Sequence, residues 1–431
     1  MGTAAGWLDF CPQPRPLAGG DQYNVFLSYR SVNRPWVLNL YDVLKQQGFK
    51  VFLDQYILKG GDSLTSVLED GLQQSQAGVL IWSSATADSK WVRREYETLE
   101  RYATDKPGFH FVPVKLDSSP LPTFATSRVY HDFSSYPDGP NGGELLRLVH
   151  AIVGLPLSDA AVKFAAEQDE AAMIAQAKIK AALINRNKAR IIALFEEGGL
   201  AWDSSSALGC LAAEGLTKLG DNEAAIRVLE TLRKKFPRSI RPVQLHALAL
   251  ARRKQSGDLD TAQEMLGELY ARNERDPETV GIYARTWMDR FELSGDRADL
   301  EQSRDLYAEA FGHSPDDYYT GINAASKSVL IGTEEDLQRG AEYAAKVQTL
   351  VGVEPVPGDY WKTATAAEVQ LLQKNYAAAA KLYDAAVDMS RGHRGSHEST
   401  WKQACRLMAK LNPPESDRAA IRKVFAHLPD C

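Results

Sequence analysis

The sequence has few of the features that mark several large classes of protein. Its four cysteines, at positions 11, 210, 405 and 431, show no paired spacing. This scatter argues against a disulfide framework or a zinc site and predicts free thiols in a reducing compartment. No apolar run approaches the length that spans a bilayer, and the first residues lack a secretory pattern. The net charge of -6 leaves no basic surface for nucleic acid. We therefore expect a cytoplasmic protein that binds neither membranes nor nucleic acid.

Motifs of several common catalytic sites are also missing. The chain has no phosphate-binding loop that ends in Lys followed by Ser or Thr, and no serine-nucleophile elbow. The eight histidines show no metal-ligand spacing. His393 and His397 are four residues apart, but Gly392 and Gly395 argue against a helix that would bring them together. We expect neither a metal nor a bound cofactor.

Residues 23–155 alternate between strand and helix patterns. Near-continuous apolar strands separated by amphipathic helices predict a doubly wound parallel sheet covered on both faces. Ligands of such sheets lie beyond the carboxyl ends of the strands, where Tyr29, Arg30, Asp54 and the loop after Trp82 are expected. The strands are predicted at 24–29, 49–53, 77–82, 109–116 and 129–133, and the helices at 34–47, 63–74, 88–102 and 143–153.

The remainder of the chain divides into three further segments. Residues 1–22 are rich in proline and glycine and are predicted to be a flexible lead-in. Residues 156–200 are predicted to be a helical linker. From residue 201 to the C-terminus, glycine recurs at positions 220, 257, 295 and 332, each time before an amphipathic helix. This regularity predicts an all-helical solenoid of stacked helix pairs over 201–431.

One helix combines an aromatic ring with a carboxylate. Trp91 and Glu95 are four residues apart near the start of the predicted helix 88–102, so they share one helix face. Such a pair can form a pocket wall for a ligand that has a flat ring and hydroxyl groups. The spacing by itself is a weak signal, because many surface helices carry a glutamate and a tryptophan beside it usually belongs to the core.

Three motifs in order resemble Toll/interleukin-1 receptor (TIR) domains. Residues 23–30, YNVFLSYR, are similar to the first signature of that family, and residues 48–54, GFKVFLD, are similar to the second. Residues 91–95 resemble the Trp-x-x-x-Glu segment of the branch that cleaves NAD⁺. The resemblance covers about a third of the chain and implies a flavodoxin-like fold for residues 23–155.

The resemblance also implies roles for single residues. Glu95 corresponds to the catalytic carboxylate, and NAD⁺ would be substrate rather than cofactor. The structural alternatives are a core tryptophan at 91, a surface ion pair at Arg30 and a turn cap at Asp54. Ser63 stands where some animal relatives have an aromatic residue, which leaves the product open. The positions implied to contact NAD⁺ are Tyr29, Arg30, Asp54, Lys59, Gly61 and Trp91.

The helical region is similar to tetratricopeptide arrays. Residues 318–323 and 359–365 more particularly resemble the TRAF-binding helical region of stress-activated kinase kinases. Together the two resemblances imply an NAD⁺ nucleosidase that yields nicotinamide and ADP-ribose or a cyclic isomer. They imply activation through TIR self-association, with repeats that bind a protein, peptide or small-ligand trigger in antiphage or innate immune defence. The alternatives are a non-catalytic TIR scaffold that recruits partners and a nucleotide sensor without turnover.

Overall fold

The computed structural model describes residues 6–17, 19–53, 64–87, 90–122, 125, 128–391 and 394–430. Of residues 31, 64–68, 85, 87 and 90–97 only the backbone is described. The chain divides into two compact units, residues 1–274 and 275–431, here called the N-terminal unit and the C-terminal unit. Each unit is considered by itself.

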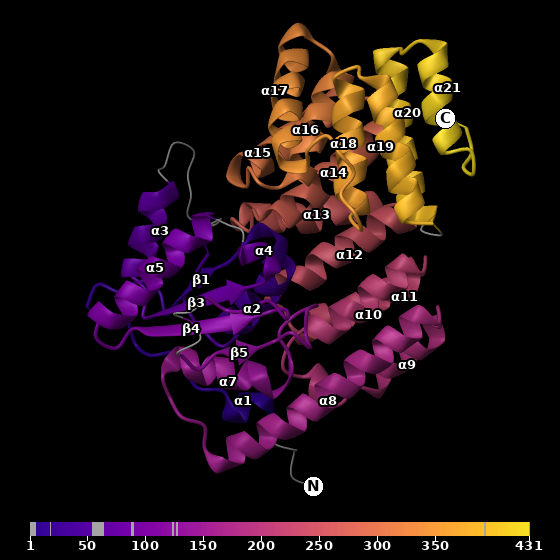
Figure 1. Cartoon of the computed structure of the whole chain (residues 1–431). Helices are drawn as coiled ribbons and strands as arrows, with labels where there is room; N and C mark the ends of the chain where they lie inside the picture. Colours follow the sequence, from indigo (N-terminus) through magenta and orange to yellow (C-terminus); the bar gives the residue numbers. More distant parts are fainter. Residues whose placement is uncertain are drawn as a thin grey trace. The chain divides into compact units, whose positions relative to one another are not determined.

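A parallel sheet forms the centre of the N-terminal unit, as predicted. Its described strands follow the order β2-β1-β3-β4-β5 (Figure 1), with every pair parallel. Successive crossovers therefore place the first strand inside the sheet, which is the doubly wound arrangement. The strands are β1 Val25–Ser28, β2 Val51–Phe52, β3 Ala77–Trp82, β4 His110–Lys115 and β5 His131–Asp132.

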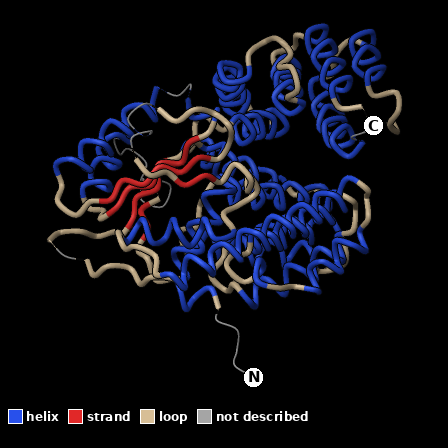
Figure 2. Tube along the Cα trace, turned by 60° about the horizontal axis from the view of Figure 1, so that its bottom comes forward, coloured by secondary structure: helices blue, strands red, loops and turns tan. Residues whose placement is uncertain are grey.

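Alternate residues of the strands point to opposite faces of the sheet and belong to two separate hydrophobic cores. Leu27 and Val79 face one side and join the core under helices α2 and α7, whereas Phe26 and Leu80 face the other side with α3 and α5. Figure 2 shows helices on both sides of the red strands. The helices of these layers are α2 Arg34–Gln46, α3 Leu64–Gln73, the short α4 Ser84–Ala87, α5 Lys90–Asp105 and α7 Gly142–Val153, with a 3-10 turn at Ser31–Asn33.

The N-terminal segment is packed against the sheet domain. Helix α1, Trp7–Phe10, inserts Trp7 into the core, where the side chain is only 2% exposed. Arg15 donates hydrogen bonds to the carbonyl oxygens of Gly108 and Gln76, each at 3.1 Å. The expectation of a flexible lead-in is therefore wrong for the described residues 6–17, because their anchors are single side chains that composition does not reveal.

Helices that follow the sheet complete the N-terminal unit. Asp42 of α2 accepts a hydrogen bond of 2.7 Å from the backbone nitrogen of Ile240, and Asn39 contacts the Ser206 hydroxyl at 3.2 Å. The predicted linker and the first repeats thus form one packed body with the sheet. These helices are α8 Asp159–Ile184, α9 Lys188–Glu197, α10 Ala207–Lys218, α11 Asn222–Lys235, α12 Ile240–Arg253 and α13 Asp258–Ala271, with a 3-10 turn at Leu200–Trp202.

The C-terminal unit is helical throughout its described residues. The recurrent glycines explain its periodicity: Gly295 ends α14 in the left-handed conformation, and Asp296 then caps α15 through its side chain. Gly332 and Thr333 repeat this arrangement between α16 and α17. The helices are α14 Pro277–Ser294, α15 Arg297–His313, α16 Tyr318–Ile331, α17 Glu334–Val351, α18 Tyr360–Leu372, α19 Tyr376–Met389, α20 Arg394–Leu411 and α21 Glu415–Val424.

Two further expectations can be compared with the described residues. Among them, no helix is both long and apolar enough to cross a bilayer. Cys11 and Cys210 are free, as expected, and both are buried. Cys405, in contrast, is disulfide-bonded. The prediction of free thiols is therefore wrong at Cys405, because the separation of cysteines along the chain does not limit which of them meet in the fold.

Candidate functional site

The carboxyl ends of the central strands bring several polar residues to one edge of the sheet. Tyr29 and Arg30 directly follow β1, Ser83 and Ser84 follow β3, and Asp117 follows β4 after one residue. Because these strands are parallel neighbours, their ends meet at the same edge. The loop after β2, which holds the predicted positions Asp54, Lys59 and Gly61, lies outside the described residues.

Tyr29 and Arg30 occupy the position that the sequence predicts. Both side chains are partly buried, and Tyr29 packs against the core under α2. The carbonyl oxygen of Arg30 accepts a 2.8 Å hydrogen bond from the backbone nitrogen of Asn33. The Asn33 side chain in turn donates to the hydroxyl of Ser83 at 3.0 Å. The segments that follow β1 and β3 are thus tied together by direct hydrogen bonds.

Asp117 fixes the neighbouring part of the edge. Its carboxylate accepts hydrogen bonds from the backbone nitrogens of Ser84 at 2.7 Å and Ser119 at 2.9 Å, and another from the Ser119 hydroxyl. Burial favours a higher pKa for Asp117, but the hydrogen bonds from Ser119 and Ser84 outweigh it and hold the pKa at about 2. Asp117 was not among the predicted residues, although its place just after the fourth strand was a usable signal.

The positions of Trp91 and Glu95 lie in the first turns of α5. Their backbone is helical, and their side chains are outside the described part of the structure. Leu99 is one turn beyond Glu95 and is fully buried against β3, where a Cβ on Gly78 would overlap it.

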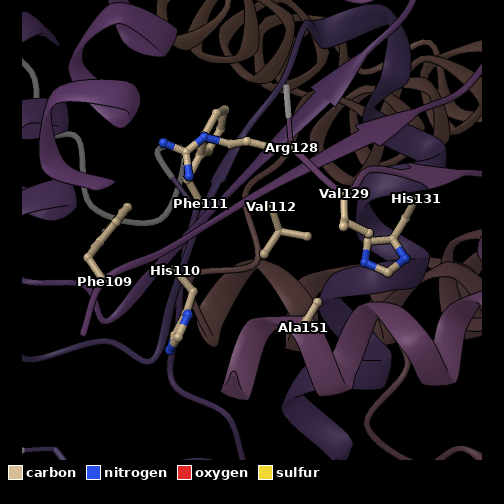
Figure 3. Close-up of a pocket in the computed structure, with 8 residues that line it drawn as sticks. All are labelled: Phe109, His110, Phe111, Val112, Arg128, Val129, His131 and Ala151. Atoms are coloured by element: carbon tan, nitrogen blue, oxygen red, sulfur yellow. The ribbon is translucent and has the colours of Figure 1, made fainter. Parts of the chain in front are cut away.

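A cavity of about 350 Å³ lies elsewhere, along the outer side of β4. The neighbouring strand β5 pairs only with Val114 and Lys115, at the end of β4. Burial, followed by the charge of Arg15, lowers the pKa of His110 beside the cavity. The cavity lies along the first half of β4, away from the carboxyl edge. Figure 3 shows its lining residues, Phe109, His110, Phe111, Val112, Arg128, Val129, His131 and Ala151.

The described residues contain no group of three or more His, Cys, Asp or Glu side chains arranged to hold a metal ion. The described part of the edge instead offers a half-buried guanidinium, a phenol, hydroxyl groups and an ionised carboxylate. This set can hold a polar ligand through hydrogen bonds and charge.

Comparison with known proteins assigns families to both regions. Residues 25–147 match the model of the TIR domain, and residues 221–329 match the model described as Tetratricopeptide Repeats-Sensor. Among solved structures, yeast Tom70 covers 91% of this chain and 72% of its own, with 13% identity and a TM-score of 0.40.

Three curated relatives match parts of the sheet domain. They are a protein named "Probable 2' cyclic ADP-D-ribose synthase TcpB" from Brucella melitensis, 34% identical over 80 residues, the "2' cyclic ADP-D-ribose synthase AbTIR" of Acinetobacter baumannii, 32% over 79 residues, and the "NAD(+) hydrolase TcpA" of Theionarchaea archaeon, 28% over 98 residues. The matches cover 18%, 18% and 22% of this chain and 32%, 29% and 30% of the relatives. The chain therefore spans about a third of the length of these relatives.

Proposed function

Because residues 25–147 are a TIR domain and residues 221–329 a tetratricopeptide-repeat sensor region, we propose that this chain cleaves NAD⁺ at the nicotinamide–ribose bond. The observation that carries the proposal is the match of the sheet domain to relatives named for NAD⁺ hydrolysis and for cyclic ADP-ribose synthesis. The polar edge at the ends of β1, β3 and β4 supports it, because ligands of doubly wound sheets lie there.

Glu95 is the proposed catalytic carboxylate. Breaking the bond between ribose and nicotinamide builds positive charge on the ribose, as glycoside cleavage does. A fixed carboxylate can hold the ribose hydroxyls and stabilise that charge as it develops. Nicotinamide leaves as a neutral molecule with the bonding electron pair. Water then adds to the ribose and releases a proton, which completes ADP-ribose.

The remaining predicted residues would hold the substrate. Arg30 is placed at the carboxyl edge, where a guanidinium can pair with a phosphate. Tyr29, Asp54, Lys59 and Gly61 would line the pocket beside it, and Trp91 would stack on the substrate. If a nucleophile within the substrate attacks in place of water, the product is a cyclic isomer. The relatives' names include both outcomes, so product separation belongs in the first assay.

Self-association of TIR domains is the proposed mode of activation. In the N-terminal unit, α8 packs on α7 and α12 packs on α2. Among the described residues, α3 and α5 make no comparable contact with these helices, and Val129 beside the cavity along β4 is 85% exposed. A second copy could therefore dock on this side. The repeats would bind a protein, peptide or small-ligand trigger, and the biological setting would be antiphage or innate immune defence.

The test is NAD⁺ consumption by the full chain, with nicotinamide and nucleotide products separated. Glu95→Gln keeps the shape of the side chain and removes its charge. We expect the rate to fall by about 10²–10³-fold, the usual loss when one electrostatic group is removed from an active site. Glu100→Gln, on the same helix, is the matched control and should retain the wild-type rate. Turnover that survives Glu95→Gln would refute the site assignment.

A silent wild type would be assayed again after forced clustering of the full chain on a surface. Turnover that appears only in the cluster would support activation by assembly. Silence under both conditions would favour the non-catalytic scaffold.

A further inference from the structure

Four alternate helices of the C-terminal unit turn polar faces toward one another. The faces belong to α14, α16, α18 and α20 (orange to yellow in Figure 1), and α18 and α20 each contact α16. Polar faces of amphipathic helices usually face bulk solvent. The residues that meet here are Arg285, Asp289 and Glu292 of α14, Asn323, Ser326 and Lys327 of α16, Glu368 of α18, and Lys402, Gln403 and Arg406 of α20.

One half of this cluster is closed by its own contacts. Glu292 pairs with Lys402 at 2.6 Å and also with Arg406. Glu368 accepts a hydrogen bond of 2.9 Å from the side chain of Gln403. These contacts join α14 and α18 to α20, so the charges of Glu292 and Arg406 are compensated within the unit.

The other half carries two cations with few partners. Lys327 is only 3% exposed, and its ammonium donates one hydrogen bond, 2.7 Å to the side-chain oxygen of Asn323. The ammonium also lies 5.4 Å from the ring centre of Tyr307. An ammonium has three donors, so among the described residues two remain without an acceptor. Arg285 makes one ion pair in the described structure, with Asp289 at the long distance of 3.9 Å.

A buried cation with unused donors is costly unless a ligand or water fills them. Burial lowers the pKa of Lys327 to about 8, which is the shift that incomplete compensation produces. Among the groups that influence this pKa, Glu368 and Asp289 raise it and Arg285 lowers it. Arg285 and Lys327 are thus close enough to repel each other, and a single anion between them would relieve both.

The side chain of Tyr319 shows that solvent reaches this region. It is 46% exposed, and yet its crowded surroundings desolvate the phenol and raise its pKa. The Tyr319 hydroxyl lies 3.5 Å from that of the buried Tyr307, whose ring faces the Lys327 ammonium, so the partly exposed Tyr319 lies beside the group that holds Lys327. Gly281 of α14 makes room for the ring, since a Cβ there would lie 3.3 Å from Tyr319. Arg285 is four residues beyond Gly281 on α14 and shares its helix face, so it lies on the side of α14 that meets Tyr319.

We propose that Lys327, Arg285 and Tyr319 together bind a small organic phosphate. The phosphate would take the free donors of Lys327 and Arg285, because two cations suit a group with two negative charges. A flat ring on the ligand would lie against Tyr319, and Glu368 at the other side could accept hydrogen bonds from ligand hydroxyls. The proposal concerns a site in the C-terminal unit and does not depend on the cleavage of NAD⁺.

The test is calorimetric titration of the full chain at constant ionic strength with three probes: inorganic pyrophosphate, ADP-ribose and succinate. Pyrophosphate supplies the charge alone, ADP-ribose adds a ring and hydroxyl groups, and succinate is a dianion without phosphate. We expect ADP-ribose to bind more tightly than pyrophosphate, and succinate to bind least.

The variants test whether the probes bind at Lys327, Arg285 and Tyr319. Lys327→Met and Arg285→Gln should each lower the affinity for both phosphate probes by about tenfold or more, which is the usual effect of losing a charged hydrogen bond. Arg297→Gln removes an exposed guanidinium that pairs with Glu301 and should change nothing. Tyr319→Ala should lower the affinity for ADP-ribose and leave the affinity for pyrophosphate unchanged.

Three results would overturn the proposal. The first is that wild type, Lys327→Met and Arg285→Gln bind the phosphate probes equally well. The others are that millimolar pyrophosphate and ADP-ribose give no heat of binding, or that succinate binds as tightly as pyrophosphate. Circular dichroism would show whether each variant is folded. Arg285 is partly exposed, so its replacement gives an independent result if Lys327→Met does not fold.

Discussion

Asp42 offers a direct test of how the sheet domain is joined to the helices that follow it. Ser239 precedes α12 but its side chain makes no capping hydrogen bond. The carboxylate of Asp42, on α2, instead accepts the hydrogen bond of Ile240, the first residue of α12, at 2.7 Å. Asp42 is only 1% exposed. A residue of the sheet domain therefore caps a helix of the repeat region.

The expected loss of stability when Asp42 is replaced has two contributions. A buried hydrogen bond to a charged group contributes about 1.5–3 kcal/mol. A negative charge at a helix N-terminus adds about 0.3–1 kcal/mol. Asp42→Ala should therefore reduce the free energy of local opening at this contact by about 2 kcal/mol or more. Because each 1.4 kcal/mol is a factor of ten, amide hydrogen exchange at the start of α12 should become at least about thirtyfold faster.

The assay is hydrogen exchange of the full chain, followed by mass spectrometry on peptides that cover α2 and α12. Asp42→Asn keeps an acceptor oxygen and loses the charge, so its effect should be smaller than that of Asp42→Ala. Asp70→Ala is the control, because Asp70 is an exposed aspartate of the same domain. If α12 exchanges at the wild-type rate in Asp42→Ala, the cap contributes nothing and the reasoning is refuted.

Two further predictions concern the packing of α7 and the carboxyl edge of the sheet. A Cβ at Gly143 would overlap the backbone carbonyl of Ala165 on α8, so Gly143→Ala should destabilise the protein by about 1–3 kcal/mol. Gly312→Ala, where a Cβ meets nothing within 4 Å, should be neutral or stabilise α15 by up to about 1 kcal/mol, and scanning calorimetry would compare the two. The pKa of Asp117 is lowered from 3.8 to about 2, so its contribution is present above pH 3.8 and is lost as the pH falls through about 2. Asp117→Asn should weaken the pH dependence of the free energy of unfolding in that window, as measured by acid unfolding. An unchanged pH dependence below pH 3.8 would contradict the assignment.

The strands of the sheet domain could be predicted because their patterns are local. The central strands β1, β3 and β4 lie inside their predicted ranges and differ at the ends by one residue or none. The edge strands are shorter than predicted: β2 is Val51–Phe52 and β5 is His131–Asp132. An edge strand has a neighbour on one side only, so apolar residues at its ends, such as Phe49 and Phe133, can be buried without ladder hydrogen bonds, whereas Val129 is exposed.

Contacts between distant segments could not be predicted from the sequence. Nothing near Trp7 indicates the core that it enters, and the polar run around Asp42 gives no sign of its partner at Ile240. In the candidate site, Tyr29 and Arg30 follow from the end of the first strand, and the same rule would have found Asp117. Glu95 follows from the family resemblance, because the spacing of a tryptophan and a glutamate is too common to identify a catalytic group. The cluster around Lys327 was missed because polar helix faces are normally solvated.

The covered layer of the sheet domain restricts how activation can work. Sliding α2 or α7 away from α8 and α12 would break the Asp42–Ile240 hydrogen bond and expose apolar residues of the shared core. Helix α5, which holds the position of Glu95, belongs to the opposite layer. Contacts made on α3, α5 and the outer side of β4 leave this interface intact, so that side is the less costly one for the self-association that we propose.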